Sequence, residues 1–247
     1  MDFISFLISV TMLFQNSGEL NNYYFIDGDI LLPKDNNIVP NAALIDSSKY
    51  WKKGLVYFSF SNKKIHSENS KKLIRESMSE LSQIANIKFI EVDSNEISNY
   101  QNYVIINNEA GCFSTVGAFQ NGYISLLDPG VQGAPSCMLK GVIKHELLHT
   151  LGFWHEQSRF DRDNYVKIYY ENMNPQYVYA FAKQGPESAR VGSYDINSIM
   201  HYGSYYFSNN NRPTMLTIEG SEIKPNLNNL SEKDKEALIN AYGKRNE

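Results

Sequence analysis

The sequence lacks the features of a membrane-spanning or nucleic-acid-binding protein. Its longest apolar run, residues 3–14, is shorter than the roughly 20 residues that cross a bilayer. It carries no basic stripe and a formal charge of only −4, which argues against nucleic acid as a partner. It contains no internal repeat. Apolar residues nevertheless make up 42% of the 247 residues, enough for one folded domain after a short N-terminal segment.

The apolar run at the N-terminus has the length of a signal-peptide core. Small and polar residues follow it up to Gly18, as they do near a signal cleavage site. Asp2 stands where a positive charge is usual, and the alternative is an ordinary N-terminal strand or helix. We expect a signal peptide over residues 1–18, and therefore a secreted protein with no membrane contact once the peptide is removed.

Cysteine is scarce, with Cys112 and Cys137 as the only two. In a cytosolic protein such a pair would most often be buried thiols. In a secreted protein the two would be bonded, and closing a loop of this size stabilises a fold by about 3–4 kcal/mol.

Hydrophobic periodicity predicts strands first and helices later, which favours an α+β fold over a doubly wound sheet. Residues 19–41 are rich in Asn, Asp and Pro and are expected to form an extended tail. We expect His66 to be a surface residue. The expected strands are 55–60, 88–92, 103–107 and 123–127, and the expected helices are 70–85, 141–151 and 232–242, the last with Ser231 as N-cap.

The residue spacing in one helix indicates a metal site. His145 and His149 are four residues apart and share a helix face. Gly152 can adopt a positive φ and turn the chain back, so that His155 can complete a set of three imidazoles. Three neutral imidazoles suit Zn²⁺ and leave an open position for water.

Glu146 lies beside these ligands without being needed as one. Its carboxylate can take a proton from a zinc-activated water that attacks a peptide carbonyl, and can later protonate the leaving amine. This arrangement is the known signature of zincin and metzincin peptidases. The alternative, a surface helix with incidental histidines, is disfavoured because three of only five histidines fall at ligand spacing. Glu156 as third ligand is disfavoured by the adjacent, correctly spaced His155.

A methionine turn follows in metzincins, and Met200 within Ser-Ile-Met-His-Tyr (198–202) matches it. With this motif and the residues that follow His155, from Glu156 to Val166, the chain resembles the astacin family from Ala42 onward. The resemblance implies an α+β metzincin fold of two subdomains, with a twisted mixed or mostly antiparallel sheet, a long active-site helix, the Met-turn and a C-terminal helix.

The resemblance also implies roles for individual residues. Glu156 would be structural and receive the buried N-terminus of the mature enzyme, and Tyr202 would be a zinc ligand that can leave and hydrogen-bond the oxyanion. The strand at 111–114 would be the edge where substrate pairs antiparallel. Cys112 and Cys137 would form one of the two family disulfides; the other, near Asn86 and Lys244, is absent.

Family pro-segments carry an aromatic-x-Gly-Asp motif whose aspartate occupies the water site on zinc, and Asp29 matches that aspartate. Phe25 is one residue too far from Gly28 unless Ile26 takes the aromatic place. The expected organisation is therefore a signal peptide (1–18), a pro-segment (19–41) and a catalytic domain (42–247) with one Zn²⁺. We expect a monomeric, secreted endopeptidase made as a zymogen and acting on protein or peptide substrates. The alternative is a secreted binding module that has lost activity.

Overall fold

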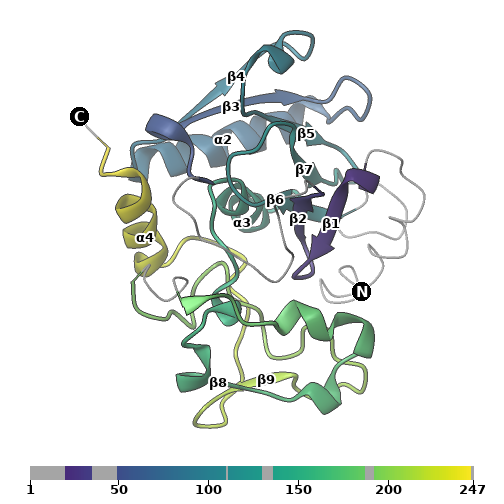
Figure 1. Cartoon of the computed structure of the whole chain (residues 1–247), viewed down its shortest axis with the longest axis vertical. Coiled ribbons are helices and arrows are strands. Elements are labelled where there is room, and N and C mark those ends of the chain that lie inside the picture. The colour runs from purple at the N-terminus through teal and green to yellow at the C-terminus, as the bar shows by residue number, and fades with distance from the viewer. Residues whose placement is uncertain (1–19, 35–48, 110, 130–135, 187–191, 246–247) are drawn as a thin grey trace.

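The computed structural model describes residues 20–34, 49–109, 111–129, 136–186 and 192–245. The expected signal peptide and the expected mature start at Ala42 lie outside these ranges. A sheet with its helices forms one part of the molecule, and a largely irregular part lies below it (Figure 1). Within the described ranges, no helix is both long and apolar enough to cross a membrane.

The sheet has seven strands in the order β1-β2-β6-β7-β5-β3-β4. Four of its pairings are parallel and two, β1–β2 and β6–β7, are antiparallel. The expected mixed sheet is confirmed, but a mostly antiparallel one is wrong, because long crossovers such as the helix between β3 and β4 bring strands side by side in parallel. The strands are β1 (Tyr23–Ile26), β2 (Ile30–Pro33), β3 (Leu55–Phe60), β4 (Lys88–Glu91), β5 (Val104–Asn107), β6 (Cys112–Thr115) and β7 (Gly122–Leu126).

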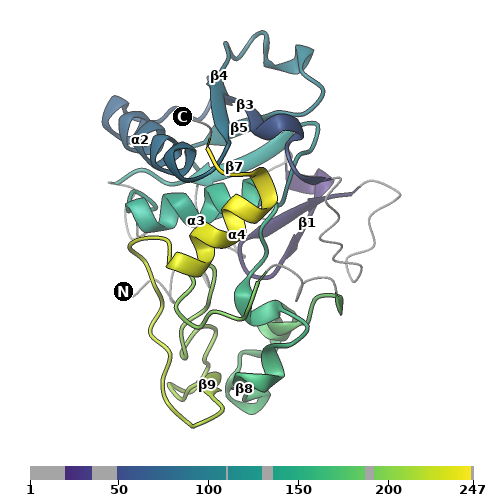
Figure 2. The ribbon, with the colours of Figure 1, turned by 90° about the vertical axis from the view of Figure 1, so that its left-hand side faces the viewer.

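Two helices pack against this sheet and against each other, and a third helix contacts the first of them (Figure 2). They are α2 (Glu68–Ile84), α3 (Lys140–Thr150) and α4 (Glu232–Tyr242). In α2 the predicted apolar face is buried, and Ser67 caps its first turn through the backbone N–H of Ser70. At Gly141 a Cβ would stand 1.9 Å from the carbonyl oxygen of Leu227, so glycine lets α3 approach that segment.

Hydrogen bonds stabilise both ends of the C-terminal helix α4. Ser231 is its N-cap, as predicted, and forms a capping box with Asp234. At the other end, the backbone N–H of Asn86 donates to the carbonyl of Gly243 over 2.9 Å, and Ala85 bridges Lys244. This backbone bridge lies where the second family disulfide would have been, so the helix is tied to α2 without it.

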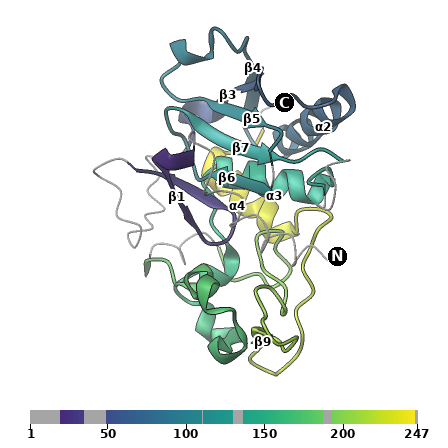
Figure 3. The same ribbon diagram turned by 90° about the vertical axis from the view of Figure 1, so that its right-hand side faces the viewer.

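The segment that was expected to be an extended tail forms a hairpin, which corrects that prediction for residues 20–33. Strands β1 and β2 pair antiparallel, and β2 adds to β6 in parallel, with Ile30 opposite Ser114 (Figure 3). Ile30 and Leu31 are fully buried, and residues 27–29 form the turn that joins the two apolar strands. Strand β6 is therefore not an edge here, because β2 covers it.

A second correction concerns His66, which is 2% exposed rather than on the surface. Its Nε2 lies 2.7 Å from the carbonyl oxygen of Leu126, and its ring contacts Phe60. The predicted pair Cys112 and Cys137 is bonded, which joins β6 to the segment before α3.

The lower part is held by a separate core rich in aromatic residues, among them Tyr177, Phe181, Tyr194, Tyr202 and Phe207. It contains short 3-10 turns and one two-stranded sheet, β8 (Val166–Ile168) with β9 (Met215–Thr217). Aromatic packing replaces regular secondary structure here, which explains the many tyrosines of this stretch.

Candidate metal centre and active site

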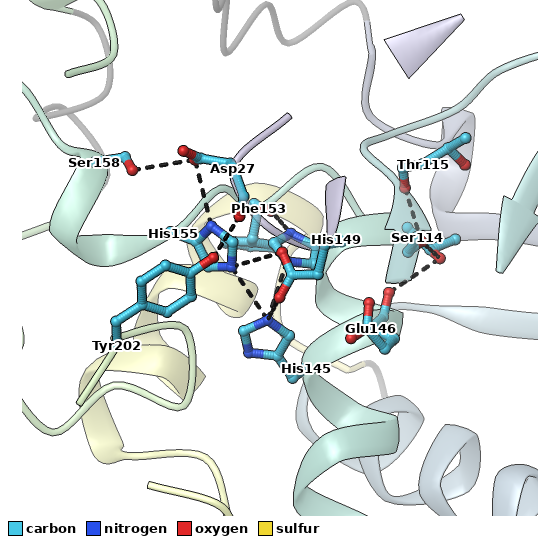
Figure 4. Close-up of polar contacts among 12 residues, drawn as sticks. Asp27, Ser114, Thr115, His145, Glu146, His149, Phe153, His155, Ser158 and Tyr202 are labelled. Carbon is cyan, nitrogen blue, oxygen red and sulfur yellow. Dashed lines mark hydrogen bonds and ion pairs between the residues drawn. The ribbon is translucent and has the colours of Figure 1, made fainter. Parts of the chain in front are cut away.

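The three predicted histidines converge on one point (Figure 4). His145 and His149 project from α3, which ends at Thr150, and Gly152 then adopts φ +99°. This left-handed conformation turns the chain so that His155 faces the helix. The Nε2 atom of His145 lies 3.1 Å from that of His149 and 3.3 Å from that of His155.

The other ring nitrogen of each histidine is already engaged. Nδ1 of His145 lies 2.8 Å from the carbonyl oxygen of Ile199, and Nδ1 of His149 lies 2.7 Å from that of Phe153. Nδ1 of His155 lies 3.3 Å from a carboxylate oxygen of Asp27. Because carbonyl and carboxylate oxygens accept, each Nδ1 carries a proton, so that each Nε2, when unprotonated, turns its lone pair inward.

Three inward lone pairs repel one another unless a cation lies between them. Two ligands of a tetrahedral Zn²⁺ at 2.0–2.1 Å are separated by about 3.3 Å. The observed separations of 3.1 Å and 3.3 Å between the Nε2 atoms match that edge length. The donor set therefore fits zinc, whereas a hydrogen-bonded cluster of neutral imidazoles would lack the protons it needs.

Asp29 supplies a fourth donor to this set. Its carboxylate oxygens lie 3.3 Å, 3.5 Å and 3.0 Å from Nε2 of His145, His149 and His155, and all four ligand atoms fall within 4.8 Å of one another. Oδ1 is buried and, despite its proximity to His155, accepts no hydrogen bond from the described residues. Burial would raise the pKa of Asp29, but its contacts with His155, His145 and His149 hold it well below its usual value.

Glu146 is 1% exposed, and its Oε2 has no hydrogen-bond partner among the described residues. Burial, followed by the negative charge of Asp29, raises the pKa of this carboxyl well above its usual value. It lies next to the histidine set without belonging to it (Figure 4). This is an arrangement suited to accepting a proton.

The Met-turn places Tyr202 beside the third histidine. The rings of Tyr202 and His155 have centroids 4.5 Å apart, and burial raises the pKa of the phenol well above its usual value. The hydroxyl of Tyr202 donates to the carbonyl oxygen of Asp27. Met200 is buried in the main core beside α3, and its carbonyl accepts from the N–H of Glu156.

His201, in the same turn, does not join the metal set. Its Nδ1–H donates to the carbonyl of Tyr202, and its Nε2 accepts from the hydroxyl of Tyr194, each over 2.7 Å. It supports the turn that carries Tyr202.

Glu156 lines a cavity of about 60 Å³ that is also lined by His155, Arg159, Asp195 and Lys233. Its carboxylate accepts from the backbone N–H of Asp195 over 2.7 Å. Burial, partly offset by the charge of Arg159, raises its pKa to about 7. The chain segment that would start the mature enzyme lies outside the described residues.

Sequence reasoning missed Asp27. This residue is 3% exposed and accepts from the hydroxyl of Ser158 over 3.1 Å as well as facing His155. It stands two positions before Asp29, with φ +52°, so both carboxylates leave the same hairpin turn toward the site. The acidic pair around Gly28 was the available signal.

A family model described as Astacin (Peptidase family M12A) matches residues 43–243. The chain belongs to the astacin family. Zinc metalloproteinase nas-15 of Caenorhabditis elegans is 33% identical to it over 81% of the chain. High choriolytic enzyme 1 of Oryzias latipes is 30% identical, with 81% of this chain and 70% of that protein aligned. The solved structure of that hatching enzyme has a TM-score of 0.70 at 29% identity, covering 82% of this chain and 98% of that one.

This astacin-family chain spans less than half the length of several curated relatives, for instance 34% of nas-15 and 43% of the astacin-like metalloendopeptidase of Mus musculus. The family match begins at residue 43, so the hairpin with Asp27 and Asp29 precedes it. The expected α+β metzincin fold is confirmed by the match to the hatching enzyme, and the histidine set agrees with the zinc dependence named for nas-15.

Proposed function

We propose that this chain is a zinc-dependent endopeptidase held inactive by its own N-terminal hairpin, with His145, His149 and His155 as metal ligands. The observation that carries the proposal is the convergence of three inward-facing Nε2 atoms beside Glu146, whose Oε2 has no hydrogen-bond partner among the described residues. Zinc, when bound there, supplies the Lewis acid that activates water and polarises a carbonyl. Secretion is part of the proposal, because residues 3–14 have the length of a signal-peptide core.

Glu146 acts as the general base. Its raised pKa suits a group that takes a proton from the attacking water and returns it to the leaving amine. Burial of the carboxylate favours its neutral form, so the proton is held until the amine departs. Neither step requires Glu146 to be a ligand.

Tyr202 donates to the oxyanion that forms at the scissile carbonyl. A phenol with a raised pKa keeps its proton at neutral pH and remains a donor. In the structure this hydroxyl is occupied by the carbonyl of Asp27. The hairpin thus holds the oxyanion donor at the same time as Asp29 faces the metal ligands.

Latency follows from the same contacts. Asp29 takes the position that an attacking water would need, and β2 covers the edge of β6 along which an extended substrate would pair. Proteolysis between Pro33 and Trp51 would free this edge. The cavity beside Glu156 would then receive the new N-terminus, as the resemblance implies, and this contact would stabilise the mature form. We propose that the mature form is a monomer.

The proposal is tested with purified precursor, processed protein and a matched Glu146→Ala protein, each incubated with gelatin with and without a chelator. We expect only processed wild-type protein to cleave, and only without chelator. Glu146→Ala should retain zinc at one equivalent, measured by metal analysis, and lose activity by about 10²–10⁴-fold. Absence of zinc, or chelator-insensitive cleavage, would contradict the proposal; zinc binding without cleavage would favour the binding module.

A further inference from the structure

The three histidines differ in the group that accepts a hydrogen bond from their Nδ1–H. His145 and His149 donate their Nδ1–H to backbone carbonyls of Ile199 and Phe153, which belong to the family-matched region 43–243. Only His155 donates to a side chain, the carboxylate of Asp27. That side chain comes from the hairpin, which precedes the matched region.

Asp27 is held for this contact from several directions. Its second acceptor role, toward the hydroxyl of Ser158 over 3.1 Å, fixes the carboxylate beside the ring. Its carbonyl accepts from Tyr202, and its backbone has φ +52°, a left-handed conformation that is uncommon for residues other than glycine. An uncommon backbone conformation together with three polar contacts on a buried residue indicates that the position of Asp27 has a functional role.

We propose that Asp27 is a positioning residue that completes a carboxylate–histidine–metal arrangement on His155. The precursor would therefore bind zinc more tightly than the additional ligand Asp29 alone would explain. The inference rests on the proposed function. A carboxylate behind a metal-bound imidazole fixes the ring and increases its basicity, and loss of such a partner typically weakens metal affinity about 10–100-fold.

Activation would therefore remove two contacts from the metal centre in one step. Removal of the hairpin takes away the Asp29 donor in front of the metal and the Asp27 acceptor behind His155. The mature enzyme would keep backbone support for two ligands and would have to support the third with solvent or substrate.

The test compares zinc affinity of the precursor and of Asp27→Asn, measured by competition with a chromogenic chelator in a Glu146→Ala background so that neither protein cleaves itself. Asparagine retains the size and an acceptor oxygen but removes the charge. We expect the zinc dissociation constant of the Asp27→Asn precursor to rise about 10-fold. After processing by an added protease the two proteins are identical in sequence, and their dissociation constants should be equal.

A second measurement separates support of His155 from displacement of the whole hairpin. In precursor labelled with ¹⁵N-histidine, the Nδ1–H signal of His155 should shift in Asp27→Asn, whereas those of His145 and His149 stay in place. Equal zinc affinity of both precursors, or an unshifted His155 signal, would overturn the inference and leave the proposed function standing. Failure of the wild-type precursor to bind zinc would instead overturn the proposed function.

Discussion

Gly28 approaches Tyr202 so closely that a Cβ built on the glycine would stand 2.7 Å from the phenolic oxygen. The same Cβ would lie 2.8 Å from the ring of Phe207, and the backbone at Gly28 has φ +83°. Glycine is therefore required at the tip of the hairpin, both for the turn and for its insertion between the aromatic rings.

Gly28→Ala should release the hairpin from the site. Strain of about 1–2 kcal/mol, added to a contact that must give way, should make the unprocessed precursor partly active toward a peptide substrate. Gly220→Ala is the matched control, because Gly220 has a similar φ of +85° and nothing within 4 Å of the added Cβ. Residual activity of the intact precursor is the measurement, and equal latency in both variants would show that the tip does not block the site.

Tyr202→Phe should lower kcat of the processed enzyme by about 10²–10³-fold with little change in KM, because the lost hydroxyl donates only to the oxyanion of the transition state. Tyr205→Phe is the control, since that neighbouring tyrosine contacts Glu222 at the surface. Steady-state kinetics on one fluorogenic peptide would distinguish them. A rise confined to KM would place Tyr202 in substrate binding instead.

Asp234 joins the C-terminal helix to the Met-turn. Its carboxylate accepts from the hydroxyl of Ser198 over 2.6 Å and from the N–H of Ile199 over 2.9 Å. Asp234→Ala leaves both buried donors without this acceptor, so the free energy of unfolding should fall by about 2–3 kcal/mol. Glu236→Ala, on the exposed side of the same helix, should change it by less than about 0.5 kcal/mol. Urea unfolding of the inactive Glu146→Ala precursor measures both, and similar losses would refute the link.

His66 should make stability depend on pH. Burial lowers the pKa of His66 in the folded protein, only partly offset by Leu126 and Asp128, so the unfolded chain takes up the proton more readily. The contribution of neutral His66 is present above about pH 6.5 and declines as the pH falls toward the lowered folded value. In a Glu146→Ala background, the loss of unfolding free energy between pH 7.5 and 5.5 should be smaller for His66→Gln than for His66. Equal losses would show that another group controls this range.

Local spacing alone predicted which histidines converge in the structure. His145 and His149 share a helix face by geometry, and Gly152 is the residue that best allows the turn to His155, so the candidate ligands could be named before any fold was known. The same holds for Ser231, whose cap depends on residues three positions away, and for the apolar face of α2.

What only the tertiary structure decided concerns contacts between segments far apart in the chain. Asp-Gly at 27–28 between two apolar runs is a local hairpin signal that the sequence analysis did not use. The pairing of β2 with β6, some 80 residues away, could come only from the tertiary structure. The burial of His66 and the position of Asp27 behind His155 likewise depend on which surfaces meet. Short-range patterns encode helix faces, turns and ligand spacing, whereas burial and the partner of a carboxylate are properties of the assembled core.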